Sequence, residues 1–318
     1  MKRSGRRYAG IDLGTNSIRL LVAEVRDGGS IHPLLRLGES CRLGEGMEKS
    51  GRISESAEQR TVESLCTFVE RARTFEPAGI AVAATHALRS ASNGEEVTRR
   101  LSEAAGLPVE ILSGEDEARL VYSAVAAALP PERKVEPLLV IDVGGGSVEF
   151  VRAEAGQVAA WCSLHLGCVR LTERFIASDP ATEEEYAALG AHVRQELEEH
   201  RGLLEGLAAA AGVGGTLTAL AALDLGLARY EASRVEGHYL SREAIARWAK
   251  RLRALSNWER SGLPAVGNGR ADIIVAGCGV LETVLELAPV PGFTVSTQGL
   301  RYALVQRMGA AEATSQPA

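Results

Sequence analysis

The chain has 318 residues, which is too long for one typical domain and comfortable for two domains that each bury a core. Apolar residues make up 46% and charged residues 24%, as in ordinary globular proteins, and the formal net charge of −6 argues against a general binder of nucleic acid or membrane surfaces. A polyanionic ligand would therefore need local basic residues and a metal ion.

The five cysteines are scattered, without a C-x-x-C pair or a histidine at zinc spacing. An odd number of scattered thiols fits buried free cysteines in a reducing compartment. The basic first residues make a poor signal peptide, because Asp12 interrupts the apolar run that follows, and no run of about 18 apolar residues predicts a membrane span. We therefore expect a cytoplasmic protein.

The chain begins with a strand, turn and strand pattern. Strands are expected over 8–11, 18–25 and 31–37, so this edge of the sheet is antiparallel. A helix is expected over 54–73, where apolar side chains recur at helical spacing and Ser56 resembles the first residue of a capping box. This helix is interpreted as core scaffold.

A short apolar strand over 79–85 leads into Arg89. If this strand is parallel to its neighbours, Arg89 lies just past its carboxyl end, where open α/β sheets place ligand residues. His86 could act as a general base, although a lone histidine beside apolar residues is more often structural. A helix to about residue 105 and a strand over 108–112 are expected next.

The following helix opens with three acids, Glu115, Asp116 and Glu117. Acids in a first turn commonly complement the positive end of the helix dipole. Alternatively, one of them points toward the ligand and takes a proton from water. Two prolines at 130–131 end this helix, and the polar stretch 132–136 is interpreted as a hinge between lobes.

The second half opens with an apolar strand that ends in a glycine-rich turn. The turn residues are Gly144, Gly145, Gly146 and Ser147. Glycines leave backbone N–H groups bare, so the turn can surround an anion. Asp142, at the strand end, could hold Mg²⁺ directly or through water. Taken alone, the stretch could also be an ordinary glycine-rich hairpin.

The same pattern occurs twice. Residues 11–20 align without gaps on 141–150, and Ile, Asp, Gly and Ser recur in phase. An internal repeat of this kind predicts two similar lobes, each with one phosphate-binding turn. The residues of the first turn are Gly14, Thr15, Asn16 and Ser17. We expect a first lobe over 1–130 and a second over 131–318, with a last helix that could pack back on the first lobe.

A third glycine turn is expected near the middle of the second lobe. A strand over 208–211 ends before Gly214, Gly215 and Thr216, which could cradle a second section of the ligand or could simply begin a helix. The other elements expected in this lobe are strands over 151–153, 157–163 and 293–296, helices over 182–200, 241–255 and 271–287, a closing helix from 300, and a frayed tail after 308.

With these segments in place, the sequence resembles the exopolyphosphatase and guanosine pentaphosphate phosphohydrolase family over about residues 8–308. Besides the two turns, the segments that carry the resemblance are Thr85–Arg89, Ser113–Arg119, Gly214–Thr216, Arg270–Asp272 and Gly299–Arg301. The resemblance implies the α/β fold of the actin-like ATPase superfamily, with two ribonuclease H-like lobes around a central cleft.

The resemblance also implies roles for particular residues. Glu117 matches the family's catalytic glutamate, which positions and deprotonates the attacking water. Arg89 matches a contact to substrate phosphate, and Arg270 is a weaker substrate candidate because its glycine-rich lead-in is looser than in many relatives. The two turns and Gly214–Thr216 are expected to bind phosphate. The acids expected beside Mg²⁺ (or Mn²⁺) are Asp12, Asp142 and Glu149.

The leading hypothesis is Mg-assisted hydrolysis of terminal phosphate from inorganic polyphosphate. The chain stops soon after Arg301 and looks like the short form of the family, which favours short polyphosphate chains over processive action. The alternatives are a guanosine pentaphosphate phosphohydrolase, a kinase of the same superfamily, and a non-catalytic alarmone or nucleotide sensor. A homodimer is the default expectation for such an enzyme.

Overall fold

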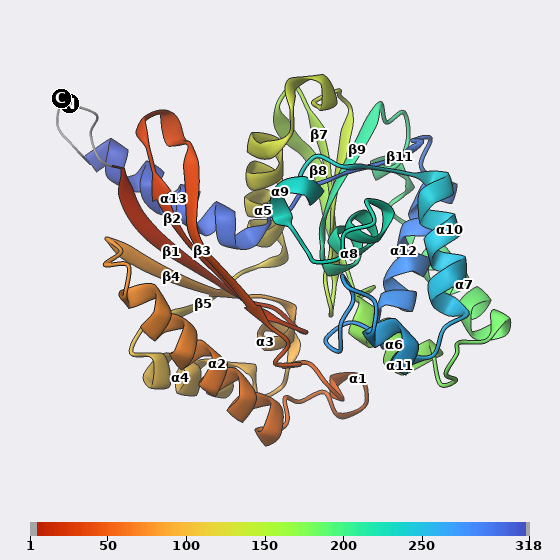
Figure 1. The fold of residues 1–318 in the computed structure, drawn as a ribbon, viewed down its shortest axis with the longest axis horizontal. Helices are drawn as coiled ribbons and strands as arrows, with labels where there is room; N and C mark the ends of the chain where they lie inside the picture. Colours follow the sequence, from red (N-terminus) through yellow and green to blue (C-terminus); the bar gives the residue numbers. More distant parts are fainter. Residues whose placement is uncertain (1–4, 316–318) are drawn as a thin grey trace. The chain divides into compact units, whose positions relative to one another are not determined.

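The computed structural model describes residues 5–315, which form two units (Figure 1). Unit 1 comprises Met1–Ala124 and Leu300–Ala318, and unit 2 comprises Val125–Gly299. The sequence analysis placed the division between residues 130 and 131 and let the last helix pack on the first lobe. In the structure, the division falls inside one helix, and the last helix belongs to unit 1.

Unit 1 contains a five-stranded sheet in the order β3-β2-β1-β4-β5. Its strands are β1 (Arg6–Leu13), β2 (Ile18–Val25), β3 (Ile31–Glu39), β4 (Gly79–Ala84) and β5 (Val109–Ile111). The first three strands are antiparallel to one another, whereas β4 and β5 continue the sheet in parallel with β1. The helices are α1 (Met47–Ser50), α2 (Glu55–Arg73), α3 (His86–Ser90), α4 (Gly94–Ala105), α5 (Gly114–Ala128) and α13 (Leu300–Ser315).

The sheet of unit 1 is covered on both faces, with α2 and α4 on one side and α13 on the other (Figure 1). Because side chains alternate along a strand, neighbours on β2 enter different cores. Leu20 packs with Leu65 of α2, while Leu21 packs with Tyr302 of α13. The helix over 54–73 is thus core scaffold, as predicted, but Ser54 caps it rather than Ser56, accepting from the Ala57 N–H group.

Helix α13 lies directly on β1 because position 10 is a glycine. A Cβ atom at Gly10 would lie 2.4 Å from the carbonyl oxygen of Arg301 and 3.1 Å from Cβ of Leu304. The prediction of a frayed tail after Met308 was wrong for residues 309–315, since the helix continues to Ser315, and its last part, 316–318, lies outside the described residues. Gly309 allows this continuation, because a Cβ there would lie 2.9 Å from Val25 on the adjacent strand.

Unit 2 contains a six-stranded sheet in the order β10-β11-β9-β6-β7-β8. Its strands are β6 (Leu138–Val143), β7 (Val148–Glu154), β8 (Gln157–Leu164), β9 (Ala209–Gly214), β10 (Tyr239–Ser241) and β11 (Gly292–Val295). Its helices are α6 (Cys168–Phe175), α7 (Glu183–Glu198), α8 (Gly215–Asp224), α9 (Ala232–Val235), α10 (Arg242–Arg253), α11 (Asn257–Ser261) and α12 (Ile274–Leu287). The mostly buried α12 packs against α7 and α10.

The two sheets share one topology. The order β3-β2-β1-β4-β5 of unit 1 returns in unit 2 as β8-β7-β6-β9-β11, and β10 extends the second sheet by one antiparallel edge strand. In both units the first strand pairs antiparallel with the second and parallel with the fourth. The predicted α/β fold with two ribonuclease H-like lobes is therefore confirmed.

Within residues 5–315, every helix is too short or too polar to cross a lipid bilayer.

The close approach of α13 to β1 predicts that Gly10→Ala lowers the free energy of unfolding by about 1–3 kcal/mol, because the new methyl group overlaps a main-chain oxygen. Urea denaturation measures this. Gly38→Ala on β3 is the control, since its Cβ would meet nothing closer than 3.9 Å and should change stability by less than about 1 kcal/mol. Equal effects of the two substitutions would contradict the packing described.

Candidate functional site

Two hairpins of the same design present the two glycine turns. In the first, Leu13 pairs with Ile18 and the Gly14 N–H group donates to the Ser17 carbonyl at 3.0 Å. In the second, Val143 pairs with Val148, and Gly144 donates to Ser147 at 3.1 Å. The repeat seen in the sequence is therefore also a repeat of strand register and turn closure.

The carbonyl groups of the first turn are held by the segment that follows β3. The Thr15 carbonyl accepts from the Gly44 N–H group at 2.9 Å, and the Asn16 carbonyl accepts from Arg42 at 3.0 Å. A Cβ atom at Gly44 would lie 2.3 Å from Cγ2 of Thr15, so this segment can approach only as glycine. Because carbonyl oxygens repel an anion, their engagement here leaves anion binding to the N–H groups of the turn.

The second turn is held in the same way by the residues after β8. Carbonyl groups within 144–146 accept from the N–H groups of Gly167, Cys168 and Val169 at 3.3, 3.0 and 2.8 Å. These N–H groups belong to the start of α6, which carries no side-chain cap, so the turn itself satisfies the helix N-terminus. A Cβ at Gly167 would lie 2.3 Å from the carbonyl carbon and oxygen of Gly145.

Asp12 lies near the end of β1, directly opposite Arg19 on β2. Its side chain keeps partial contact with solvent. Burial raises the pKa of this carboxyl above its ordinary value, while Arg19 and Arg301 act in the opposite direction. The charged form of the Asp12 carboxyl is therefore disfavoured by its burial.

Asp142 occupies the corresponding position on β6, and its partner on β7 is Glu149. Glu149 is buried, and its Oε1 atom accepts from the hydroxyl groups of Ser147 at 2.6 Å and Ser163 at 2.8 Å. The second turn is thus tied to a buried carboxylate through Ser147. Among residues 5–315, no group of three or more His, Cys, Asp or Glu side chains is arranged to hold a metal ion.

Glu117 and Arg89 form an ion pair within unit 1. Arg89 lies in α3, directly after β4, and Glu117 lies in the first turn of α5, which Ser113 caps by accepting from the Asp116 N–H group at 3.0 Å. Arg89 Nη1 donates to Glu117 Oε2 at 2.9 Å and to the Leu112 carbonyl at 2.8 Å. The Glu117 side chain is only 8% exposed, so the arginine compensates a buried charge.

The third glycine turn starts α8 and lies beside Arg270. Gly214 has a φ of +108°, and a Cβ there would lie 2.5 Å from the Val143 carbonyl oxygen. A Cβ at Gly215 would lie 2.6 Å from Arg270 Nε, so the guanidinium lies against the N-terminus of α8. The charge of the guanidinium and the partial positive charge of the helix N-terminus both favour binding of an anion at this place. Thr216 instead points inward, with Oγ1 3.6 Å from Cys168 Sγ.

The buried Cys168 thiol contacts Thr216 of the third turn, and its pKa responds to the charge of Asp142. The pKa of Cys168 is raised to about 11, mainly by burial, with Asp142 also raising it and Arg270 lowering it. Both charges therefore lie close enough to the thiol to act on it. Asp142, Arg270 and the start of α8 belong to the same part of unit 2.

The predicted site residues thus fall into two groups by the unit to which they belong. Unit 1 contains Asp12, the first turn and the Arg89–Glu117 pair, whereas unit 2 contains Asp142, Glu149, the second and third turns and Arg270. The sequence analysis gave no role to Gly44, Gly167 or Ser163, or to the Leu112 carbonyl. The residue types of the turns could not have identified these supports, because each support depends on a tertiary contact.

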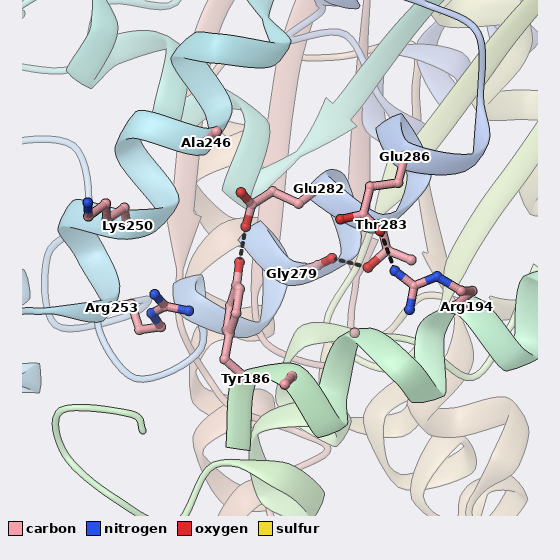
Figure 2. A pocket seen from close by; sticks show the side chains of 11 residues that line it. Tyr186, Arg194, Ala246, Lys250, Arg253, Gly279, Glu282, Thr283 and Glu286 are labelled. Atoms are coloured by element: carbon pink, nitrogen blue, oxygen red, sulfur yellow. Dashed lines mark hydrogen bonds and ion pairs between the residues drawn. The ribbon is translucent and has the colours of Figure 1, made fainter. Parts of the chain in front are cut away.

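A separate pocket of about 520 Å³ lies within unit 2, between α7, α10 and α12 (Figure 2). Two of its acids have partners that also line the pocket: Arg194 pairs with Glu286, and Tyr186 donates to Glu282 (Figure 2). Arg253 lies 4.7 Å from the centre of the Tyr186 ring. None of the residues of the two groups described above lines this pocket, so we place the candidate site at the turns.

Comparisons with known proteins relate the whole chain to one family. Residues 21–310 match the Ppx/GppA phosphatase family. Exopolyphosphatase 2 of Mycobacterium tuberculosis is 33% identical over 304 residues, which cover 91% of this chain and 94% of that protein. The crystal structure of the Aquifex aeolicus member of the Ppx/GppA family is 33% identical, with a TM-score of 0.80, and covers 96% of this chain and 98% of its own. An exopolyphosphatase from Cytophaga hutchinsonii is 26% identical, with a TM-score of 0.89 and coverage of 96% and 98%.

The contact of Gly167 with the second turn predicts that Gly167→Ala lowers the free energy of unfolding by about 1–3 kcal/mol, because the methyl group must displace main-chain atoms of the turn. Thermal and urea unfolding measure the loss. Gly202→Ala, whose Cβ would meet nothing within 4 Å, is the matched substitution in the same unit and should be nearly neutral. A neutral Gly167→Ala would show that the turn and α6 are not packed as described.

Because Glu282 is partly buried in this pocket, we expect the free energy of unfolding to depend on pH. Burial raises the pKa of Glu282 above its ordinary value, so the folded protein keeps this proton longer than the unfolded chain does. Stability therefore falls as the pH rises from 4.5, the pKa of this carboxyl in the unfolded chain, through its higher pKa in the folded protein. Glu282→Gln should remove this loss and gain less than about 1 kcal/mol at pH 7, because solvent screens a half-buried group.

The gain from Glu282→Gln should shrink toward pH 4, as measured by thermal unfolding across pH. Glu184→Gln, at an exposed position of α7, should show no such trend. A gain that grows toward acidic pH would contradict the direction given for Glu282.

Proposed function

Because this chain belongs to the Ppx/GppA phosphatase family, we propose that it releases terminal orthophosphate from inorganic polyphosphate, with short chains as its preferred substrates. The observation that carries this proposal is the buried Glu117, held by Arg89 at the start of α5 in the same unit as the first glycine turn. Hydrolysis of a phosphoanhydride needs both a positioned carboxylate and groups that bind phosphate, and this unit contains a candidate for each.

Cleavage of a phosphoanhydride depends on positioning, neutralisation of charge and an aimed nucleophile more than on covalent chemistry. The N–H groups of the turns would donate to phosphoryl oxygens and stabilise the charge that develops there. Glu117 would accept a hydrogen bond from water, orient it in line with the leaving oxygen and take its proton. Arg89 would contact the phosphate that is attacked.

The acids at the strand ends fit a divalent cation of the Mg²⁺ or Mn²⁺ type. Carboxylate oxygens are the ligands that Mg²⁺ prefers, and the raised pKa of Asp12 shows that its charge lacks full compensation. Asp12 in unit 1 and Asp142 in unit 2 are each a proposed ligand of such a cation, while Glu149, whose Oε1 already accepts two hydroxyl groups, would mainly orient Ser147. When bound, the cation would neutralise charge on the substrate phosphates.

The proposal predicts that Glu117→Gln lowers the rate of phosphate release by about 10²–10⁴-fold, because glutamine cannot accept the proton of water. Release of phosphate from tripolyphosphate and longer chains with Mg²⁺ measures this. Glu115→Gln is the matched control, since Glu115 lies in the same helical turn but is exposed and pairs with Arg119. It should keep nearly the activity of the unmodified protein.

Guanosine pentaphosphate belongs in the same assay, because its terminal phosphoanhydride presents the same reacting group. Faster turnover of guanosine pentaphosphate than of every polyphosphate would replace the proposed substrate but keep the reaction. Tight binding of either substrate with no release of phosphate would contradict the proposal and favour a sensor.

A further inference from the structure

We infer that Arg89 also positions Glu117. One guanidinium would then fix the catalytic carboxylate relative to the phosphate that the activated water attacks. This inference rests on the proposed function and adds a second role for Arg89 within it. The evidence lies in how the N–H groups of Arg89 are shared.

The Nη1 atom of Arg89 has two N–H bonds, and the protein uses both. One points to Glu117 Oε2 at 2.9 Å and the other to the Leu112 carbonyl at 2.8 Å. The Leu112 carbonyl is itself fixed, because the N–H group of the same residue donates to Ala84 at the end of β4 at 2.9 Å. Glu117 is therefore linked to the sheet through one nitrogen atom of Arg89.

The remaining edge of the guanidinium carries three N–H donors, at Nε and Nη2. Within residues 5–315 these donors make no hydrogen bond or ion pair, and the Arg89 side chain is 24% exposed. The Nε–Nη2 edge is the planar fork that binds two oxygens of a phosphate. Arg89 can therefore hold Glu117 and a phosphate at the same time, without giving up one for the other.

Burial strengthens and aligns the ion pair between Arg89 and Glu117. Glu117 is 8% exposed, and an ion pair in such surroundings is stronger and better aligned than one on the surface. A lysine at position 89 would keep the positive charge, but it is a point charge and cannot keep the carbonyl, the carboxylate and a phosphate in one plane. Loss of the fork should therefore displace Glu117, and small displacements of a positioned group cost up to about 10²-fold in rate.

A role in phosphate binding alone gives a different result. In that case Arg89→Lys weakens substrate binding, and its effect on kcat does not depend on the residue at 117. If Arg89 acts through Glu117, its effect on kcat disappears once the carboxylate can no longer reach the guanidinium. The effect on binding remains in both cases, so the two roles separate in kcat and in affinity.

The test is a double-mutant cycle with Arg89→Lys, Glu117→Asp and the double variant, measured with tripolyphosphate and Mg²⁺. The aspartate keeps a carboxylate but is one methylene too short for the pair with Arg89. We expect each single variant to lower kcat by about 10–100-fold, and the double variant to be within about threefold of the slower single variant. Binding of tripolyphosphate, measured by calorimetry on Glu117→Gln, should still weaken about tenfold or more when Arg89→Lys is added.

Arg100→Lys is the matched control, because Arg100 forms an ion pair with Glu58 elsewhere in unit 1, and kcat should not change. If Arg89→Lys does not fold, Arg89→Gln replaces it in the cycle. If the loss in kcat of the double variant equals the product of the two single losses within about threefold, the positioning role is overturned and the proposed function stays intact. An unmodified protein that releases no phosphate, or an unaffected Glu117→Gln variant, would remove the proposed function and this inference with it.

Discussion

Main-chain N–H groups hold the carbonyl oxygens of both glycine turns, and the rest of the candidate site depends on this constraint. In unit 1 the donors follow β3, and in unit 2 they form the start of α6. Gly44 and Gly167 permit the close approach, because a Cβ at either position would lie 2.3 Å from the turn. With the carbonyl groups engaged, each turn can present its N–H groups to an anion, which is the physical basis for assigning phosphate binding to sequences as short as these.

The two lobes share this framework but compensate their buried acids differently. In unit 1, Glu117 is held by a cation, Arg89, and the carboxyl of Asp12 faces Arg19 across the hairpin. In unit 2 the residue that corresponds to Arg19 is Glu149, which two serine hydroxyl groups stabilise. A hydroxyl group lowers the cost of a buried carboxylate without cancelling its charge. The duplicated hairpin has therefore kept its geometry while its two copies have come to differ in charge.

The sequence was sufficient for features that local patterns encode. The repeat, both turns, the sheet strands of unit 1 and the helix that starts near residue 182 follow from periodicity and turn chemistry, and the structure contains each of them. The features that were missed depend on contacts between distant segments. Helix α6 begins at Cys168 because the second turn satisfies its first N–H groups, and Arg89 meets Glu117 28 residues further along the chain. The extent of α13 depends on its packing against β1 and β2, which no pattern within the helix reveals.

Phosphate binding through the N–H groups of both turns is tested most directly by nuclear magnetic resonance of the nitrogen-labelled Glu117→Gln variant. Tripolyphosphate with Mg²⁺ should shift the amide resonances of Thr15 in the first turn and of Gly145 and Gly146 in the second, because these N–H groups would donate to phosphoryl oxygens, whereas those of Gly14 and Gly144 close their turns. The amide of Gly156, in the β7–β8 hairpin away from the turns, should not move. Turn resonances that stay in place at saturating ligand would contradict the assignment of the site.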